Sequence, residues 1–331
     1  MGIFTRKEKW KNYSGSINIL SDLKKSDIPK IIAEDNIHSI QLYQFRNPKK
    51  KTWETLNLLF EKHPDIRLRV LWYDNTDLSF YKEIPNLRKF TIASYNTSDY
   101  SPLLSNTKLT HFGIEETKSK SVDLSFIREF KDLESLYVDG MKKGLENVRH
   151  LKNLKKLTFR GIKMDNLDIL SNSDDLEELN LLFGSYKSLD SVAKLKQLKS
   201  LELSRVRQIP DFDFLNSLEN LQKIEFEGMS KMEEIPDLSN LKKLKGIHLH
   251  NNLRLKNIMS VGEIPNLKLL HLTFAENQKA SERKNLIEQS VDILMKSKSI
   301  EYSNIMQWTD EETTEKLIEK GVNHWNRGIE I

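Results

Sequence analysis

The chain has 331 residues, of which 38% are hydrophobic and 30% are charged, and its formal net charge is only +4. It contains no cysteine, which excludes a disulfide framework, a thiolate metal site and a cysteine nucleophile. No segment matches a secretory signal, and no uncharged apolar run approaches the roughly 18 residues of a membrane span. We therefore expect a cytoplasmic protein without membrane contacts.

The N-terminal region is predicted to contain a tail followed by irregular repeats. Residues 1–14 are rich in lysine and arginine, which is typical of a solvated basic tail. Residues 15–80 form irregular coils in this prediction, with a first strand around Ile17 and Ile19. Two helices interrupt these coils, and Ser26 and Thr52 are the expected residues at their N-terminal ends.

The middle of the chain repeats one spacing, Leu-x-x-Leu-x-Leu, at intervals of 21 to 24 residues. The last two apolar positions of each unit alternate with polar residues, which predicts a short strand with one buried face. Between the strands, apolar residues fall three apart, as one-turn or 3₁₀ helical segments require. The nine units are Leu87/Phe90/Ile92, Leu109/Phe112/Ile114, Leu133/Leu136/Val138, Leu154/Leu157/Phe159, Leu176/Leu179/Leu181, Leu198/Leu201/Leu203, Leu221/Ile224/Phe226, Leu244/Ile247/Leu249 and Leu267/Leu270/Leu272.

The C-terminal region is predicted to close the array with helices. Ser281 is the expected cap of a helix over residues 281–297 in the last coil, and Ile300 and Tyr302 are the expected apolar positions of a last strand. Asp310 is the expected cap of a further helix. The predicted organisation is thus an array of about twelve coils over residues 15–305, followed by a helical cap over residues 306–331.

The repeated units resemble the leucine-rich repeat family, and their length is closest to its short, bacterial internalin-like class. The resemblance covers about residues 15–305. It implies an α/β fold: a right-handed, curved solenoid with parallel strands on a concave face, short helical or 3₁₀ segments on the convex face, and helical caps. The family normally has Asn three residues after the last strand leucine, and here only Asn252 fits, so an irregular, divergent array is expected.

Strand residues at the fifth and seventh positions of each unit are predicted to point out from the concave face; we call them the inner lane. Two of them, Arg69 and Arg160, are basic, whereas six are acidic. Because phosphate binding needs clustered cations, we expect no nucleic-acid partner. The six acidic residues are Glu115, Asp139, Glu202, Glu225, Glu227 and Glu301.

The inner lane and its edges also carry aromatic and apolar side chains, which anchor protein interfaces. No phosphate-binding glycine loop, dinucleotide fingerprint or hydrolase motif is present in the sequence. We therefore predict a non-enzymatic scaffold without a cofactor, binding a protein with a basic or mixed surface and acting as an inhibitor or immunity protein for a toxin or enzyme. The predicted contact residues are Tyr43, Arg69, Trp72, Glu115, Tyr137, Asp139, Arg160, Leu182, Phe183, Glu202, Glu225, Glu227, His248, His250, His271 and Phe274.

A histidine cluster supports an alternative function. His248 and His250 alternate on one predicted strand, and His271 takes the position of His248 on the next, while Glu225 and Glu227 hold the equivalent pair one coil earlier. Equivalent positions on adjacent strands lie about 5 Å apart. Such a set suits a divalent metal or a proton-transfer pair, although hydrogen bonding between His and Glu needs neither. The alternative is a metal-binding or metal-sensing protein; where the histidines face the carboxylates, we expect their pKa values to rise.

Overall fold

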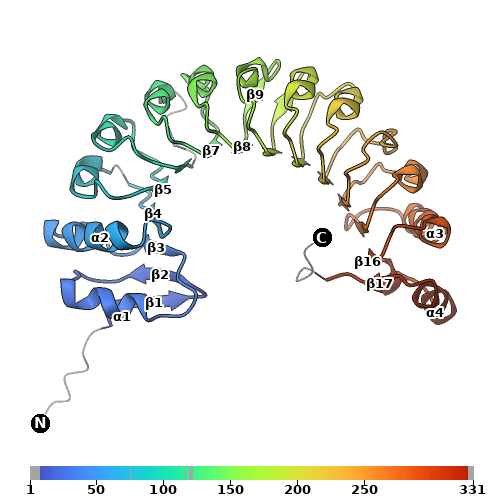
Figure 1. Cartoon of the computed structure of the whole chain (residues 1–331), viewed down its shortest axis with the longest axis horizontal. Coiled ribbons are helices and arrows are strands. Elements are labelled where there is room, and N and C mark those ends of the chain that lie inside the picture. The colour runs from blue at the N-terminus through green and yellow to red at the C-terminus, as the bar shows by residue number, and fades with distance from the viewer. Residues whose placement is uncertain (1–7, 75, 116, 119–121, 327–331) are drawn as a thin grey trace, which may run out of the picture. The chain divides into compact units, whose positions relative to one another are not determined.

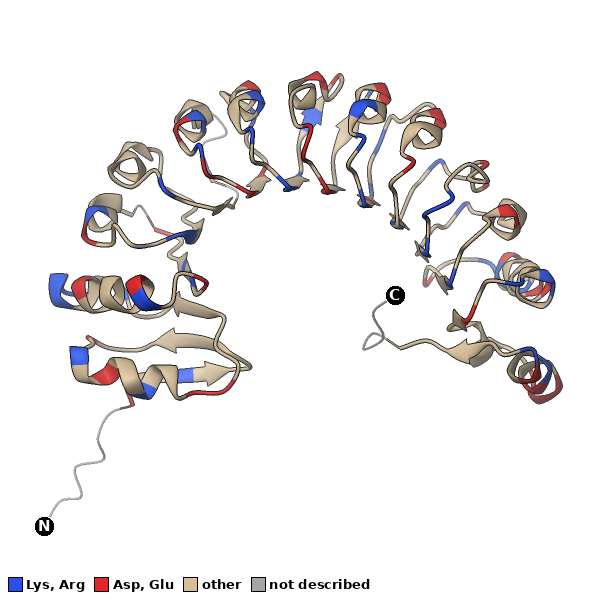
Figure 2. Ribbon diagram, viewed as in Figure 1, with Lys and Arg blue, Asp and Glu red and all other residues tan. Residues whose placement is uncertain are grey.

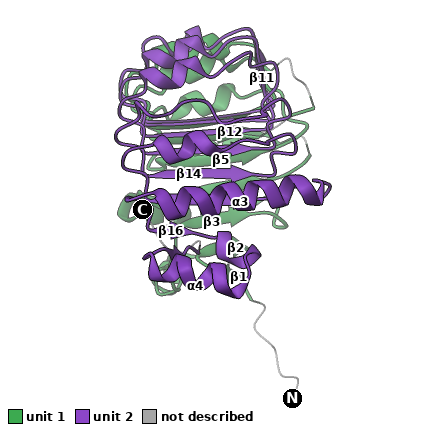
Figure 3. Cartoon of the chain, turned by 90° about the vertical axis from the view of Figure 1, so that its right-hand side faces the viewer, with its two compact units in different colours: residues 1–154 green, residues 155–331 purple. Residues whose placement is uncertain are grey.

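The computed structural model describes residues 8–74, 76–115, 117–118 and 122–326 of the chain. The chain divides into two compact units, residues 1–154 (unit 1) and residues 155–331 (unit 2), which Figure 3 colours separately. Within each unit, parallel strands lie side by side and short helical segments return the chain from one strand to the next (Figure 1). Each unit is therefore a stretch of leucine-rich repeat solenoid, as the repeat spacing predicts.

Unit 1 stacks its strands in chain order, and β2 to β7 run parallel. Ile40, Leu68 and Phe90 are in register on adjacent strands and fully buried, so the repeated apolar positions form one continuous core. The elements of unit 1 are β1 (Trp10–Tyr13), β2 (Ser16–Ile19), β3 (Ser39–Leu42), β4 (Arg67–Leu71), β5 (Lys89–Ala93), β6 (His111–Ile114) and β7 (Ser135–Asp139), the helices α1 (Ile28–Ile32) and α2 (Lys50–Lys62), and the 3₁₀ segments η1 (Lys25–Asp27), η2 (Leu78–Glu83), η3 (Ser101–Ser105), η4 (Leu124–Glu129) and η5 (Leu145–His150).

The expected tail contains a strand. β1 pairs antiparallel with β2 through a two-residue turn, in which Ser14 and Gly15 have φ of 50° and 88°. Glycine suits such a turn, and here an added Cβ would lie 2.0 Å from the carbonyl oxygen of Asn36. The Lys9 ammonium also binds the buried carboxylate of Asp27 at 2.5 Å. Residues 10–13 thus cover the first parallel strand, and the boundary expected at residue 14 cuts through this hairpin; residues 1–7 lie outside the described part.

Thr52 does not cap α2. The helix begins at Lys50, and Thr52 is fully buried inside its first turn. Its hydroxyl accepts a hydrogen bond from the backbone of Leu23 (3.0 Å) and donates one to Asp22 (2.8 Å). Thr52 therefore ties α2 to the preceding coil, a long-range role that the local sequence pattern does not reveal.

Unit 2 continues the same construction. Leu179, Leu201, Ile224, Ile247 and Leu270 follow one another in register on five adjacent strands and are all buried. The elements of unit 2 are β8 (Lys156–Arg160), β9 (Lys163–Met164), β10 (Glu178–Leu182), β11 (Ser185–Tyr186), β12 (Ser200–Ser204), β13 (Lys223–Glu227), β14 (Gly246–His250), β15 (Leu269–Thr273), β16 (Tyr302–Ser303) and β17 (Asn323–His324), the helices α3 (Ala280–Lys296) and α4 (Glu311–Glu319), and the 3₁₀ segments η6 (Asp168–Leu170), η7 (Asp190–Lys194), η8 (Asp213–Ser217), η9 (Met259–Glu263) and η10 (Ile305–Trp308).

The register of the last coil differs from the expected one. Ser303 pairs with Leu270 and is fully buried, whereas the sequence pattern places it on the inner lane. Glu301 precedes β16 and forms an ion pair with Lys268, so it does not belong to the inner lane either. Insertion of α3 lengthens this coil and shifts the pairing by three residues. An odd shift exchanges the two faces of a strand.

The two C-terminal helices lie where they are expected, although their starts differ. α3 begins after Lys279 rather than at a Ser281 cap. The side chain of Asp310 accepts a hydrogen bond from the backbone of Thr313 (2.8 Å), which confirms Asp310 as the cap of α4. The region expected to be only helical also contains β17, which pairs with β16. None of the helices in the described part of the chain is long and apolar enough to cross a membrane.

Candidate functional site

Strands β12 to β15 place two rows of polar side chains on the inner face of unit 2, the side of its strands that faces solvent. The strand residues between the rows, such as Leu203 and Phe226, are fully buried and belong to the core. The rows, in register, are Glu202, Glu225, His248 and His271, and Ser204, Glu227, His250 and Thr273. We call this surface the acid–histidine face.

Three glutamates form the acidic half of this face. Burial raises the pKa of Glu202 above its usual range, and the neighbouring Glu225 and Glu227 carboxylates raise it further. Glu225 lies 3.4 Å from the Lys223 ammonium, and Glu227 accepts a 2.7 Å hydrogen bond from Ser204. Glu202 makes no ion pair with any residue that the structure describes. Glu202 is thus a half-buried carboxyl group beside two others, and an added cation would stabilise its ionised form.

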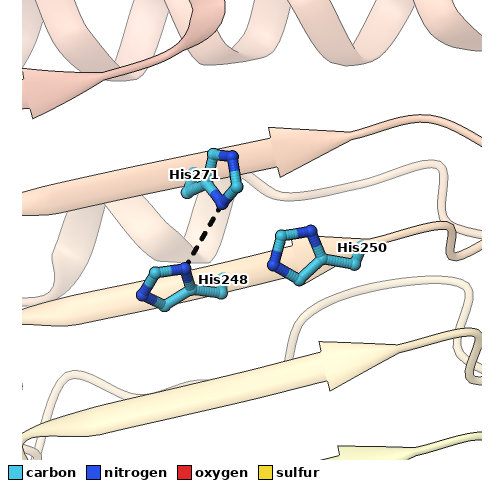
Figure 4. A group of neighbouring side chains, drawn as sticks. All are labelled: His248, His250 and His271. Carbon is cyan, nitrogen blue, oxygen red and sulfur yellow. Dashed lines mark hydrogen bonds between the residues drawn. The ribbon is translucent and has the colours of Figure 1, made fainter. Parts of the chain in front are cut away.

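The three histidines do come together, as the sequence predicts (Figure 4), but His248 and His271 are buried rather than exposed as expected. The Nδ1 atoms of His248 and His271 lie 3.3 Å apart, and His250 Nδ1 lies 3.1 Å from the hydroxyl of Thr273. His250 Nε2 lies 3.6 Å from a carboxylate oxygen of Glu225. One ligand atom from each histidine lies within 4.8 Å of the others, so the cluster offers three imidazoles to one small volume.

The expected rise in histidine pKa is wrong for His248. Burial, together with the positive charges of Lys223, His271 and His250, lowers the pKa of His248 to about 3. The carboxylate of Glu225 reaches His250 rather than His248. His248 is therefore a neutral imidazole over the physiological range of pH.

Trp325, which no repeat pattern singles out, completes the site. It follows β17, and its backbone N–H donates to the carbonyl of Ser303 (3.0 Å). Its ring centroid lies 4.4 Å from that of His271 and 5.6 Å from that of His248. Beside it lies a cavity of about 480 Å³, lined among others by Glu225, Glu227, His250, His271, His324 and Trp325.

Phe183 is exposed on the same unit and is held between two guanidinium groups. Its ring centroid lies 5.1 Å from the guanidinium carbon of Arg160 and 5.2 Å from that of Arg205. Gly228 leaves room for Arg205, because an added Cβ there would lie 2.9 Å from its Cγ. The three side chains form a cation–π sandwich, which we call the Phe183 sandwich.

The backbone of Phe183 is left-handed, with a φ of 54°. It directly follows β10, and the residues that follow β8 and β13 in the same way, Gly161 and Gly228, have φ of 66° and 58°. Arg205 and Asn251, which follow β12 and β14, are also left-handed, with φ of 51° and 53°. A left-handed residue with a side chain costs about 1–2 kcal/mol relative to glycine. The chain therefore keeps a large exposed aromatic at a position where glycine fits with less strain, which marks a candidate for function.

The predicted contact residues of unit 1 are less suited to binding a partner than those of unit 2. Arg69 and Glu115 form an ion pair with a distance of 3.2 Å, so their charges compensate each other. Tyr137 is half-buried, whereas Tyr43 is exposed.

Trp72 and Asp139 are wrongly predicted to be exposed. Trp72 is only 7% exposed and packs edge-on against Trp53 of α2 and Phe80 of η2, with ring centroids 6.3 and 5.8 Å away. It lies one residue beyond β4, where strand alternation has ended and the chain turns into the core. Asp139 is buried at the end of β7, where the chain turns at Gly140.

Two predicted contact residues of unit 2, Leu182 and Phe274, are half-buried. Phe274 packs against Trp308 with ring centroids 4.8 Å apart, so part of its surface already covers a neighbour. Leu182 ends β10 and directly precedes Phe183. It lies in register with Ser204 of β12, at the edge of the acid–histidine face.

The lysines of the flanking segments pair with acids of adjacent coils. Lys156 binds Glu178 at 2.7 Å, and Lys199 binds Glu177 at 2.8 Å. Figure 2 shows charges of both signs along the segments that lead into and out of the strands. These lysines therefore link coils to one another.

Asn252 plays the role that the family resemblance implies. Its side chain donates to the carbonyl of Phe226 (2.8 Å) and accepts from the N–H of Met229 (2.9 Å). Asn304 does the same at Leu272, with its amide donating to the carbonyl and its oxygen accepting from the N–H. Asn304 does not follow the expected spacing, because the register of β16 differs from the one that the repeat pattern predicts.

Comparison with solved structures shows the same fold. The chain is similar to an internalin, InlF, from Listeria monocytogenes, with 19% identity and a TM-score of 0.52 over 88% of this chain and 87% of the other. It is also similar to the leucine-rich repeat protein LIC12759 from Leptospira interrogans, with 20% identity and a TM-score of 0.56 over 85% and 70%. Toll from Drosophila, solved as the Toll–Spatzle complex, matches with 13% identity and a TM-score of 0.52 over 85% of this chain and 44% of that chain.

No protein-family profile and no curated protein matches the sequence. The repeat fold is thus shared with structures that have little sequence in common with the chain.

Proposed function

We propose that the chain is a non-catalytic scaffold that binds a protein over the inner face of unit 2. The observation that carries the proposal is the Phe183 sandwich: an exposed aromatic held between two arginines at a left-handed backbone position, which two other coils of unit 2 fill with glycine. Aromatic side chains and arginines are both enriched at protein interfaces. A repeat scaffold presents them without ordering a loop, which lowers the cost of binding.

The acid–histidine face supports a partner with a basic or mixed surface. Glu202, which has no ion pair with a described residue, is a half-buried carboxylate beside Glu225 and Glu227, and a lysine or arginine from a partner would relieve their repulsion. The fold adds general support, because Toll, which shares it, is solved in complex with Spatzle. The match in sequence is too low to carry that partner over to this chain.

Charge reversal on the face tests the proposal. The tagged chain is used to recover binding proteins from the cells that make it, as wild type, as Glu225→Lys/Glu227→Lys, and as Glu219→Lys/Glu263→Lys. The control glutamates are exposed and lie outside the strands. We expect the first double variant to lose the partner and the control to keep it. Equal recovery by both folded variants contradicts the proposal.

The finer proposal is that the partner is a toxin or another enzyme, which the chain inhibits by covering its active site. It is supported only by the analogy with other repeat scaffolds that act in this way. The test is the activity of the recovered partner with and without an excess of the purified chain. Full activity in the complex contradicts inhibition while leaving protein binding intact.

The alternative drawn from the sequence, metal binding at His248, His250 and His271, does not depend on a protein partner. The observation that favours it is the convergence of three imidazoles beside the cavity at Trp325.

A further inference from the structure

The histidine cluster is built from two adjacent strands rather than from one flexible loop. His248 and His271 are in register on β14 and β15, and His250 lies two residues along β14, so all three side chains leave the same side of the strands. His248 and His271 are buried, and His250 is half-buried. The strands therefore hold the three rings in a fixed arrangement.

We propose that His248, His250 and His271 form a binding site for one divalent transition-metal ion of the zinc class, with an open coordination position toward the cavity. This proposal goes beyond protein binding and does not rest on it. Three imidazoles without a thiolate suit zinc, nickel, cobalt or copper, whereas magnesium and calcium prefer oxygen ligands.

The distances fit such an ion. Two nitrogens bound to one tetrahedral zinc lie about 3.3–3.4 Å apart, because each Zn–N bond is about 2.0–2.1 Å long. The Nδ1 atoms of His248 and His271 are already 3.3 Å apart. The ligand atoms of the whole cluster lie within 4.8 Å of one another, so the nitrogens that are farther apart than in a zinc site have to approach one another when the ion binds.

The surroundings of His250 supply the outer contacts that metal-bound imidazoles use. One of its nitrogens lies 3.1 Å from the hydroxyl of Thr273, and the other lies 3.6 Å from the carboxylate of Glu225. When one nitrogen binds a metal, the opposite N–H needs an acceptor, and such contacts orient the ring. His250 has an oxygen available on either side.

The cavity leaves room for a fourth ligand from outside the chain, so three protein ligands suffice to hold the ion. His250, His271 and Trp325 line it, so an ion held by the cluster has access to the space of about 480 Å³ beside them. Zinc sites with three protein ligands keep their fourth position for water or for a donor from a bound molecule. Trp325 packs against two of the three rings, which shields one side and provides a fluorescent reporter.

Titration calorimetry on the full chain, stripped with a chelator and then dialysed, tests the proposal. Zn²⁺ is titrated into wild type and into His250→Gln, His271→Gln and His324→Gln, with Mg²⁺ as the control ion. His324 is exposed, lines the same cavity and is outside the cluster, so it is the matched control. Tryptophan fluorescence is recorded in parallel for wild type and for Trp325→Phe.

We expect one Zn²⁺ per wild-type chain, affinity at least tenfold weaker in His250→Gln and His271→Gln, and no change in His324→Gln. We also expect a fluorescence change that is lost in Trp325→Phe. If His271→Gln does not fold, His250→Gln carries the comparison, because His250 is only half-buried. No Zn²⁺ binding by folded wild type, equal affinity in the cluster variants, or equal binding of Mg²⁺ would each overturn the proposal.

Discussion

Units 1 and 2 build their inner faces from strands with the same repeat spacing, but their outward side chains meet different neighbours. In unit 1, Arg69 and Glu115 neutralise each other and Trp72 is turned into the core. In unit 2, Glu202 has no ion pair with a described residue, and Phe183 is exposed between two arginines. A shared backbone repeat therefore does not make every stretch of the inner face a binding surface.

The largest expected effect concerns stability in unit 1. Trp72→Ala should destabilise unit 1 by about 3–5 kcal/mol, because it removes a buried ring that packs against Trp53 and Phe80. Urea unfolding measures the loss. Partner affinity per folded molecule should stay unchanged; a weaker affinity would show that Trp72 reaches the interface after all.

The next effect concerns binding by unit 2. Phe183→Gly should weaken binding of the partner by about 2 kcal/mol, because it removes an aromatic anchor. Its stability should change by less than about 1 kcal/mol, since relief of the left-handed strain offsets the lost contacts with Arg160 and Arg205. Tyr43→Ala in unit 1 is the control and should leave affinity unchanged. Unfolding titrations measure the stability, and binding titrations measure the affinity. If Phe183 were merely structural, Phe183→Gly would lower the stability and leave the affinity unchanged.

A smaller difference separates two acids at the same repeat position. Glu227→Lys should weaken binding of the partner by about 1.5 kcal/mol, roughly tenfold in affinity, whereas Glu115→Lys should leave the affinity unchanged. The loss should shrink as salt is added, because it is electrostatic. Binding titrations at two ionic strengths provide the measurement. Equal losses at both positions would remove the distinction between the units.

The smallest effect concerns Glu202 itself. Its pKa is raised in the folded chain, so its contribution to stability is present below the ordinary value of 4.5 and is lost as pH rises through the folded pKa. Glu202→Gln should therefore stabilise unit 2 by about 0.2–1 kcal/mol at pH 7 and have little effect below pH 4. Thermal unfolding at both pH values checks this, and a destabilising effect at pH 7 would contradict the like-charge account.

Much of the fold follows from the sequence, because leucine spacing fixes which residues enter the core. The in-register layer of Leu201, Ile224 and Ile247 was predictable from that spacing alone. β1 was missed because its signal is a two-residue turn at Ser14 and Gly15 rather than a leucine pattern. The register of β16 was wrong because the insertion of α3 changes the coil length.

The candidate site was only partly predictable. Strand alternation correctly brings His248 and His271 together. It cannot place Trp325, which reaches the cluster from a strand more than fifty residues later in the chain. It also fails one residue beyond β4, where Trp72 turns inward, whereas Phe183 is exposed as predicted, through a left-handed backbone.

Photo-crosslinking at two matched positions tests most directly that unit 2 carries the binding face. Phe183 and Tyr43 are 45% and 44% exposed, one in each unit, and each is replaced in turn by a photoreactive phenylalanine analogue in the cells that make the chain. We predict a crosslinked partner protein from position 183 and none from position 43. Crosslinking of the same partner from position 43 alone, or of none from position 183 in the folded chain, would contradict the account.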